Sequence, residues 1–183
     1  MASIVFVDVE TGGLDPERHS LLTVGLVTLD TRTGELSRPT LLKVRDTPYR
    51  VEAEALEINR IDLQSHHGQA AEREHAAHEL HAYLQYRRKK RVMVGGHNVS
   101  FDLRFLRALL PSWNEVVLGG VIDTKVIAHF LMHTGALPRL QSSRLEDLAA
   151  HFDVRYEAHD ALEDARATAL VYARMLKLAA ERT

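Results

Sequence analysis

The sequence predicts an α/β domain built on one mixed sheet of five strands, with helices packed on both faces. Two observations support this class. Three strand-like runs lie between residues 4 and 44, and two of them are joined by a loop typical of a hairpin. After them, helical patterns alternate with short apolar runs, which is the organisation of α/β proteins.

The first predicted strand starts at Ile4 as an apolar run and ends at two glycines, Gly12 and Gly13. Glycine lets another backbone or a ligand approach closely, so we expect an open shelf where the strand ends. The second and third strands, residues 21–29 and 36–44, flank a hairpin loop at residues 30–34.

Helical patterns follow at residues 51–58 and at about 69–87, where apolar side chains form one stripe. Residues 92–94 form a short apolar run that we expect to be the fourth strand. A Gly-Gly turn then leads into a helix at residues 101–110, which Pro111 ends. Strand, turn and helix in this order form the active-site edge of many α/β folds.

The fifth strand is predicted at residues 116–122, broken by the glycines at 119 and 120. Asp123 is an N-cap for a helix to about residue 132. Ser143 and Glu146 have the spacing of a capping box for a helix that ends near residue 152. The last helix, about 159–180, buries the stripe of Ala161, Ala165, Ala169, Tyr172 and Leu176.

Composition restricts the possible functions. A chain of 183 residues fits a single domain, 1–183, with no need of covalent cross-links. It has no cysteine, which excludes disulfides, thiolate zinc sites and a cysteine nucleophile. We expect a soluble, cytoplasmic protein without membrane contact, because neither a signal peptide nor a spanning segment is apparent. The net charge of −2 means that any phosphate binding is local or carried by a metal.

Four carboxylates lie at the ends of predicted elements. Asp8 and Glu10 are two apart on the first strand and therefore share a face. Buried carboxylates repel each other, so a divalent cation is the expected partner, although an ordinary polar turn would also fit this pair alone. Asp102 begins the helix after the Gly-Gly turn, and Asp164 borders the buried stripe of the last helix. His159 lies just before or at the first turn of that helix and, taken singly, is better explained as a helix-start residue without chemistry.

Three segments containing these residues resemble the DEDDh exonucleases, the family of the proofreading subunit of replicative polymerases. FVDVETGGLD is similar to the first motif of that family, HNVSFDLRFL to the second and HDALEDARAT to the third. The link EALEINRIDL is also similar to family members. Position 160 is aspartate, whereas the sister DEDDy group would need a tyrosine there. The resemblance implies a ribonuclease H-like fold.

The resemblance also implies two divalent cations, Mg²⁺ or Mn²⁺, held by the four carboxylates. Oxygen ligands suit these hard cations, and two of them can activate water and stabilise a phosphodiester transition state. A histidine can accept a proton at neutral pH, and His159 is expected to take it from the attacking water. Substrate contacts are expected from the shelf and from the second motif: Thr11, Gly12, Gly13, Leu14, His97, Asn98 and Phe101.

The function expected from these residues is metal-dependent 3′–5′ hydrolysis of single-stranded DNA, releasing nucleoside 5′-monophosphates. Two alternatives stay open. Ribonucleases of the family use the same five residues, and the acidic cluster could belong to a non-catalytic module that binds nucleic-acid ends. The expected partners are nucleic-acid 3′ ends, with a DNA polymerase or another replication or repair protein as a possible associate.

Other charged residues are weaker candidates. A helix N-cap explains Asp123 fully. The histidines at 66, 67, 75, 78 and 81 are expected on a solvated face. The basic run 87–91 is expected away from the catalytic edge, as a solvated loop or a contact with duplex or a partner. Several arginines near the motifs could line the path of the strand: Arg104, Arg107, Arg139, Arg144 and Arg155.

Overall fold

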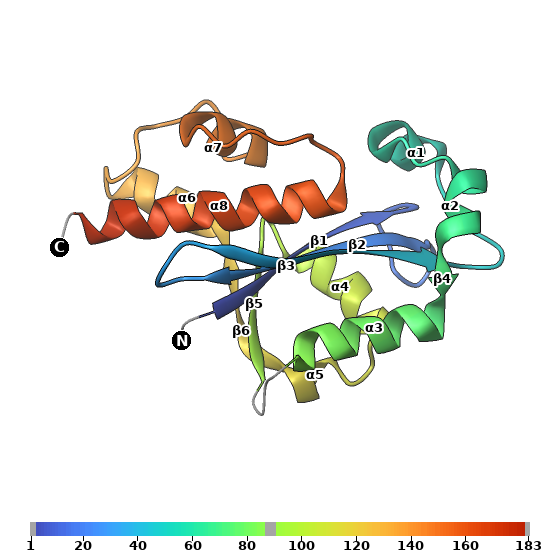
Figure 1. Cartoon of the computed structure of the whole chain (residues 1–183). Coiled ribbons are helices and arrows are strands. Elements are labelled where there is room, and N and C mark those ends of the chain that lie inside the picture. Colours follow the sequence, from blue (N-terminus) through green and yellow to red (C-terminus); the bar gives the residue numbers. More distant parts are fainter. Residues whose placement is uncertain (1–2, 87–90, 182–183) are drawn as a thin grey trace.

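The computed structural model describes residues 3–86 and 91–181. Its sheet has the strand order β4-β3-β2-β1-β5-β6 (Figure 1). The five predicted strands are all present, and a sixth strand of two residues is added at one edge. The strands are β1 (Ser3–Thr11), β2 (Leu21–Asp30), β3 (Leu36–Arg45), β4 (Ala71–Glu72), β5 (Val92–Gly96) and β6 (Val117–Asp123).

The sheet is mixed, as the sequence predicts. β1 and β2 pair antiparallel, as do β2 and β3, whereas β5 runs parallel to β1 and β6 runs parallel to β5. The extra strand β4 pairs in parallel with Val44 and Arg45 at the end of β3. Two residues are too few to produce an alternating pattern, so this strand has no signal in the sequence.

Helices connect the strands and differ from the prediction mainly between β3 and β5. Residues 63–69 form a separate helix that begins where Asp62 accepts a hydrogen bond from the Ser65 amide. The helices are α1 (Ala53–Asn59), α2 (Leu63–Gln69), α3 (Arg73–Gln85), α4 (Ser100–Leu109), α5 (Trp113–Val116), α6 (Thr124–His133), α7 (Leu145–His151) and α8 (Ala161–Ala180).

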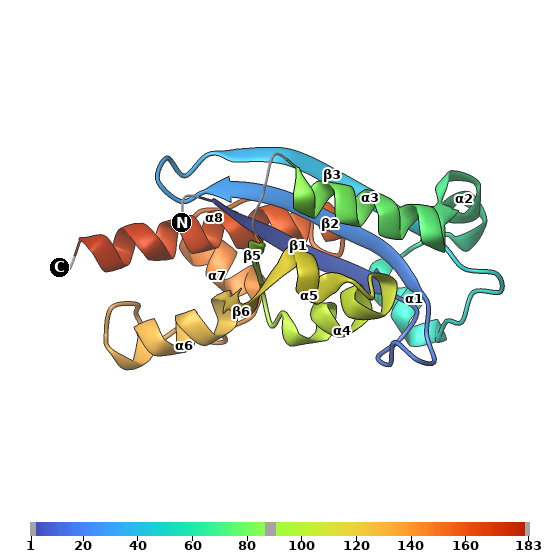
Figure 2. The same ribbon diagram turned by 90° about the horizontal axis from the view of Figure 1, so that it is seen from below.

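Helices cover both faces of the sheet. α8 lies along one face, and α3 and α4 lie on the other (Figures 1 and 2). Ile4 and Phe6 pack against the predicted α8 stripe, including Tyr172, whereas Val5 and Val7 belong to the core beneath α3 and α4. Even-numbered residues of β1 therefore face α8, and this decides where its carboxylates point.

Two local predictions are wrong. The Ser143–Glu146 capping box does not form; α7 begins at Leu145, and the Ser142 hydroxyl hydrogen-bonds Asp147 instead. β6 continues through glycines 119 and 120, but its pairing with β5 is irregular there, because Val92 pairs with Val117 and Val94 with Val121. His66 is buried, with Nε2 3.0 Å from the Val44 carbonyl oxygen, whereas His75 and His78 are exposed as expected.

Within the described residues, no helix combines the length and apolar content needed to cross a bilayer.

Candidate active site

The carboxylates of Asp8 and Glu10 point to the α8 side of the sheet. They follow Ile4 and Phe6 at two-residue spacing, and those two side chains are buried against α8. Both acids are half-buried at the end of β1. The strand therefore brings two acidic groups to the edge of a packed interface, as the sequence predicts.

The start of α8 lies close against β2. Gly25 pairs with Asp8 across the two strands, and a Cβ atom on Gly25 would lie 2.0 Å from the Ala161 carbonyl oxygen. Only glycine permits this approach. Because Asp164 lies in the first turn of α8, the contact at Gly25 brings its carboxylate over β1.

Three of the four predicted metal ligands form a cluster. Asp8, Glu10 and Asp164 each offer one carboxylate oxygen, and these oxygens lie within 4.8 Å of one another. The fourth acid, Asp102, is 4% exposed and accepts a hydrogen bond of 3.0 Å from the Val9 amide, which lies between the two acids of β1 in sequence. The donor set consists of hard oxygens, which fits Mg²⁺ or Mn²⁺.

Burial and mutual repulsion raise the pKa values of these acids. Burial raises the pKa of Glu10 to about 7 and that of Asp164 to about 6. The pKa of Asp102 rises to about 8 by burial, although the Val9 hydrogen bond opposes the rise. Burial, followed by repulsion from Asp102 and Asp164, raises the pKa of Asp8 well above its usual value. With these pKa values the four carboxyls are not all ionised at neutral pH unless positive charge lies beside them.

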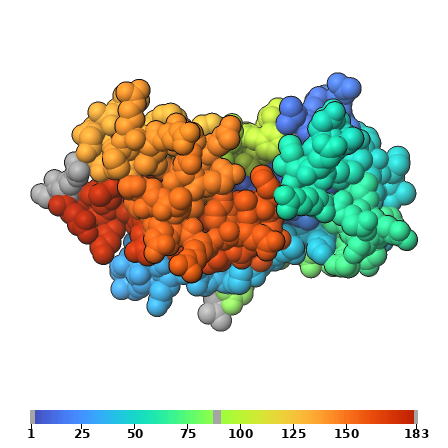
Figure 3. Space-filling view, turned by 90° about the horizontal axis from the view of Figure 1, so that it is seen from above, coloured from blue at the N-terminus to red at the C-terminus, as the bar shows by residue number. Residues whose placement is uncertain are grey.

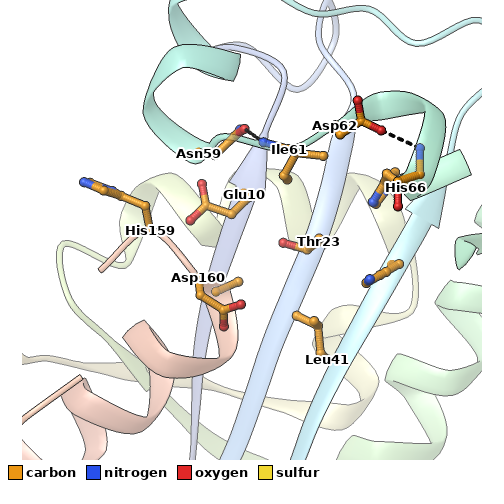
Figure 4. A pocket seen from close by; sticks show the side chains of 12 residues that line it. Glu10, Thr23, Leu41, Asn59, Ile61, Asp62, His66, His159 and Asp160 are labelled. Carbon is orange, nitrogen blue, oxygen red and sulfur yellow. Dashed lines mark hydrogen bonds between the residues drawn. The ribbon is translucent and has the colours of Figure 1, made fainter. Parts of the chain in front are cut away.

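His159 is attached to this cluster through its backbone. Its amide donates a 2.9 Å hydrogen bond to Asp164, and its φ of 68° is unusual for a residue other than glycine. The side chain is exposed, and in Figure 4 the ring extends away from Glu10. The backbone is thus fixed while the imidazole is unpacked, so side-chain rotation alone can redirect it.

The predicted shelf, Thr11–Leu14, borders a cavity of about 320 Å³. Glu10, Thr11, Gly13, Leu14 and Phe101 all line it. Leu14 is 72% exposed, which is unusual for a leucine and leaves an apolar surface beside the acids. Gly12 does not line the cavity. It packs against segment 50–52, and its carbonyl accepts a hydrogen bond of 2.7 Å from the Glu52 amide.

Ile58 and Asn59 also line this cavity, and neither was predicted from the sequence as a site residue. Ile58, near the end of α1, lines it and is 58% exposed. Asn59 is buried, and its side-chain amide donates a 3.1 Å hydrogen bond to the Thr11 carbonyl, which fixes the end of β1. Both lie in the segment EALEINRIDL, so its similarity to family members was the signal that could have identified them.

A second cavity, of about 220 Å³, lies on the other side of Glu10 and Asn59 (Figure 4). Strands β2 and β3 contribute Thr23 and Lys43 to it, and His159 lies at its border. Figure 3 shows the hollow from above, between the orange α7 and α8 and the teal α1 and α2. Glu10, one member of the acidic cluster, therefore borders both cavities.

His97 and Asn98 are not among the residues that line these two cavities. The His97 ring lies 2.8 Å from the Thr124 hydroxyl, and burial lowers its pKa. The backbone amide of Asn98 donates a hydrogen bond to the Asp123 carboxylate, and the Asn98 side chain is exposed. Both residues of the second motif thus contact the start of α6.

The other charged candidates are scattered. Arg104 donates a 3.3 Å hydrogen bond to the Leu14 carbonyl, at the rim of the 320 Å³ cavity. Arg107, Arg139, Arg144 and Arg155 are exposed. Residues 87–90 of the basic run lie outside the described residues, and Arg91 is exposed near the Asn114 carbonyl. In the ranges 3–86 and 91–181, the histidines of α2 and α3 form no metal-binding group.

A mixed α/β sheet with three carboxylates clustered at the end of its central strand is an arrangement suited to binding a divalent cation. Residues 5–172 match the model of the family described as Exonuclease. This match covers most of the chain, which therefore belongs to the exonuclease family, as the resemblance predicts.

Two kinds of curated relative are similar to the chain. The PolC-type DNA polymerase III of Thermotoga maritima is 27% identical over 97% of this chain and 12% of its own length. Ribonuclease T of Buchnera aphidicola is 24% identical over 94% of this chain and 82% of its own length. The chain thus spans a small part of the polymerases and most of the ribonuclease.

Solved structures of E. coli Exonuclease I have the same fold. Its complex with a dT13 oligonucleotide aligns with a TM-score of 0.83 at 19% identity, over 100% of this chain and 42% of that one. The zinc-bound form of its complex with single-stranded DNA gives a TM-score of 0.80 at 21% identity. This alignment covers 97% of this chain and 42% of that one. At this identity the similarity establishes the ribonuclease H-like fold of the chain.

The raised pKa values predict a pH-dependent stability in chelator. The folded protein binds protons at these carboxyls more tightly than the unfolded chain does, so unfolding releases protons and the free energy of unfolding should fall as pH rises from about 4 to about 8. A carboxyl whose pKa is one unit higher in the folded protein contributes about 1.4 kcal/mol to this fall. Urea unfolding across this range measures it. An Asp8→Asn variant should have a shallower slope, and an equal slope would contradict the repulsion inferred for the cluster.

Replacing Gly25 by alanine should displace the start of α8. The added Cβ meets backbone, which cannot rotate away, so we expect a loss of about 1–3 kcal/mol in the free energy of unfolding. Mn²⁺ affinity should fall at least tenfold, because Asp164 moves with α8. Gly119→Ala is the matched control, since nothing lies within 4 Å of its added Cβ. Equal Mn²⁺ affinity in the two variants would show that the contact at Gly25 does not position Asp164.

Proposed function

We propose that this chain is a metal-dependent 3′–5′ exonuclease that hydrolyses single-stranded DNA with two bound divalent cations. The observation that carries the proposal is the cluster of Asp8, Glu10 and Asp164 beside a partly apolar cavity. Asp102, from the other face of the sheet, completes the ligand set. Mg²⁺ or Mn²⁺ bound there would supply an activated water and neutralise the charge of the phosphodiester.

The residues around the cluster have separate tasks in this proposal. Leu14, Ile58 and Phe101 offer apolar surface for the terminal base, and base stacking on such surfaces tolerates any sequence. Thr11 and Gly13 hold the terminal sugar next to Glu10, whereas the backbone amide and carbonyl of Gly12 are hydrogen-bonded to Ser20 and Glu52. The His159 imidazole rotates over the cluster and accepts the proton that leaves the attacking water, while its backbone remains tied to Asp164.

DNA is the proposed substrate, and RNA is the second candidate. Exonuclease I, of similar fold, has been solved with oligodeoxynucleotides, and PolC-type polymerases act on DNA, which favours DNA. The chain covers 82% of the length of a Ribonuclease T, which favours RNA. Glu10 borders both cavities, so a terminal nucleotide bound in either one would lie next to the cluster.

A partner is proposed on the same grounds. In the polymerase relatives the similar region is part of a much longer chain, and a structure of similar fold is an ExoI/SSB-Ct complex. We therefore propose that this chain works in the cytoplasm beside a polymerase or another protein of replication or repair.

A labelled single strand tests the activity and its direction. With Mg²⁺ or Mn²⁺, a 5′-labelled DNA oligonucleotide should give a descending ladder, whereas a 3′-labelled one should release labelled mononucleotide at once. Chelator should stop both reactions. Asp8→Ala should lower the rate at least 10³-fold, because it removes a metal ligand, yet the variant should be at least as stable as wild type in chelator.

Each alternative predicts its own result in this assay. Faster degradation of the matched RNA oligonucleotide would reverse the substrate preference. Tight binding of 3′ ends without any ladder, in either metal, would favour the non-catalytic module. An unfolded Asp8→Ala protein would contradict the assignment of Asp8, since a repelling charge should not be needed for folding.

His159→Ala tests the proton-transfer role. The exposed imidazole is tied to the cluster only through its backbone amide, so Mn²⁺ affinity should stay within about threefold of wild type. The single-turnover rate should fall by about 10²–10⁴-fold, which is typical for loss of a general base. Calorimetric Mn²⁺ titration and rapid-quench cleavage measure the two quantities. A loss of Mn²⁺ affinity as large as that of Asp8→Ala would make His159 a metal ligand instead.

A further inference from the structure

The carboxylate of Asp123 accepts more hydrogen bonds than a helix cap requires. Its Oδ1 accepts from the Lys125 amide at 2.9 Å, which is the capping bond of α6. The same oxygen accepts from the Asn98 amide at 3.1 Å, and Oδ2 accepts from the Val99 amide at 3.2 Å. Two of the three donors therefore belong to the turn between β5 and α4, which precedes Asp123 by more than 20 residues.

The backbone of the turn that Asp123 binds is conformationally restricted. Asn98 has a φ of 56°, and a Cβ on Gly96 would lie 2.5 Å from the Val99 side chain. The Thr124 hydroxyl donates to the Gly96 carbonyl at 3.2 Å. A hydroxyl has one proton, so the same oxygen accepts from Nδ1–H of His97 at 2.8 Å. Asp123 and Thr124 thus hold both the backbone and a side chain of the turn.

Asp102 depends on this turn for its position. α4 begins directly after the turn, and Asp102 lies in its first turn. From there its Oδ1 reaches across to the Val9 amide, between Asp8 and Glu10. A shift of the turn would move Asp102 relative to both acids of β1.

We propose that Asp123 is a positioning residue of this site: its carboxylate fixes the turn between β5 and α4 and thereby holds Asp102 against β1. It touches neither substrate nor the carboxylate cluster. The inference rests on the proposed function, because its purpose is to place a metal ligand. It replaces the interpretation of Asp123 as the cap of α6 alone.

Asp123→Asn separates the two roles. Asparagine is as good an N-cap as aspartate, so α6 keeps its cap. Its amide has only one acceptor oxygen, so Oδ1 and Oδ2 can no longer both accept from the turn. We expect kcat to fall 10- to 100-fold with KM for the DNA within threefold. Mn²⁺ affinity should fall at least fivefold, and the Val9 amide should exchange hydrogen at least tenfold faster in chelator.

Asp30→Asn is the matched control. Asp30 also accepts hydrogen bonds from two backbone amides, those of Arg32 and Thr33, but it lies in the hairpin at the opposite end of β2. This variant should leave kcat, Mn²⁺ affinity and Val9 exchange within twofold of wild type. Asp123→Ser, which keeps a capping oxygen but also loses the second acceptor, should reproduce the effects of Asp123→Asn if the latter folds poorly.

The outcomes are distinct. Wild-type kcat, Mn²⁺ affinity and Val9 exchange in Asp123→Asn would overturn the inference and leave Asp123 as a cap. Unchanged Val9 exchange with reduced kcat would also overturn it, since Asp123 would then act without moving Asp102. Should the wild-type protein cleave nothing, the proposed function fails, yet faster Val9 exchange in Asp123→Asn and normal exchange in Asp30→Asn would still support the positioning of Asp102.

Discussion

The fold holds four carboxylates close enough together to repel one another, and the rest of the site depends on this repulsion. Four acids from β1, α4 and α8 are brought together at the edge of the sheet, where burial and their mutual charge raise their pKa values. Nothing in the packing of the core requires charged groups there, and apolar residues would be more stable. Such a cluster is retained in a chain when cations bind to it, and the energy stored in the repulsion then becomes affinity for those cations.

Backbone contacts hold the acids in place. Gly25 lets α8 approach β2 so that Asp164 reaches β1, and the turn after β5 directs Asp102 to the Val9 amide. Asn59 fixes the carbonyl at the end of β1. His159 differs from these residues, since only its backbone is fixed. The site thus combines rigidly held carboxylates with one side chain that is free to rotate, which is consistent with the proposed metal binding and proton transfer.

Much of this arrangement could be predicted from the sequence, because it follows from local patterns. The two-residue period of β1 placed Asp8 and Glu10 on one face, and the stripe of α8 placed Asp164 at its border. Contacts between distant segments could not be predicted in this way. Gly25, Asn59 and the turn-binding role of Asp123 depend on which strand and helix meet. The two-residue strand β4 was too short to show a pattern, and a hydrogen bond between Ser142 and Asp147 forms in place of the capping box at Ser143.

We propose that the four carboxylates bind two cations as one unit. A Mn²⁺ titration followed by electron paramagnetic resonance counts the bound ions directly and detects the coupling between neighbouring ones. We expect two coupled Mn²⁺ ions per chain in the wild type and no coupled pair in Asp164→Asn. A single uncoupled ion, or the same coupled pair in both proteins, would contradict it.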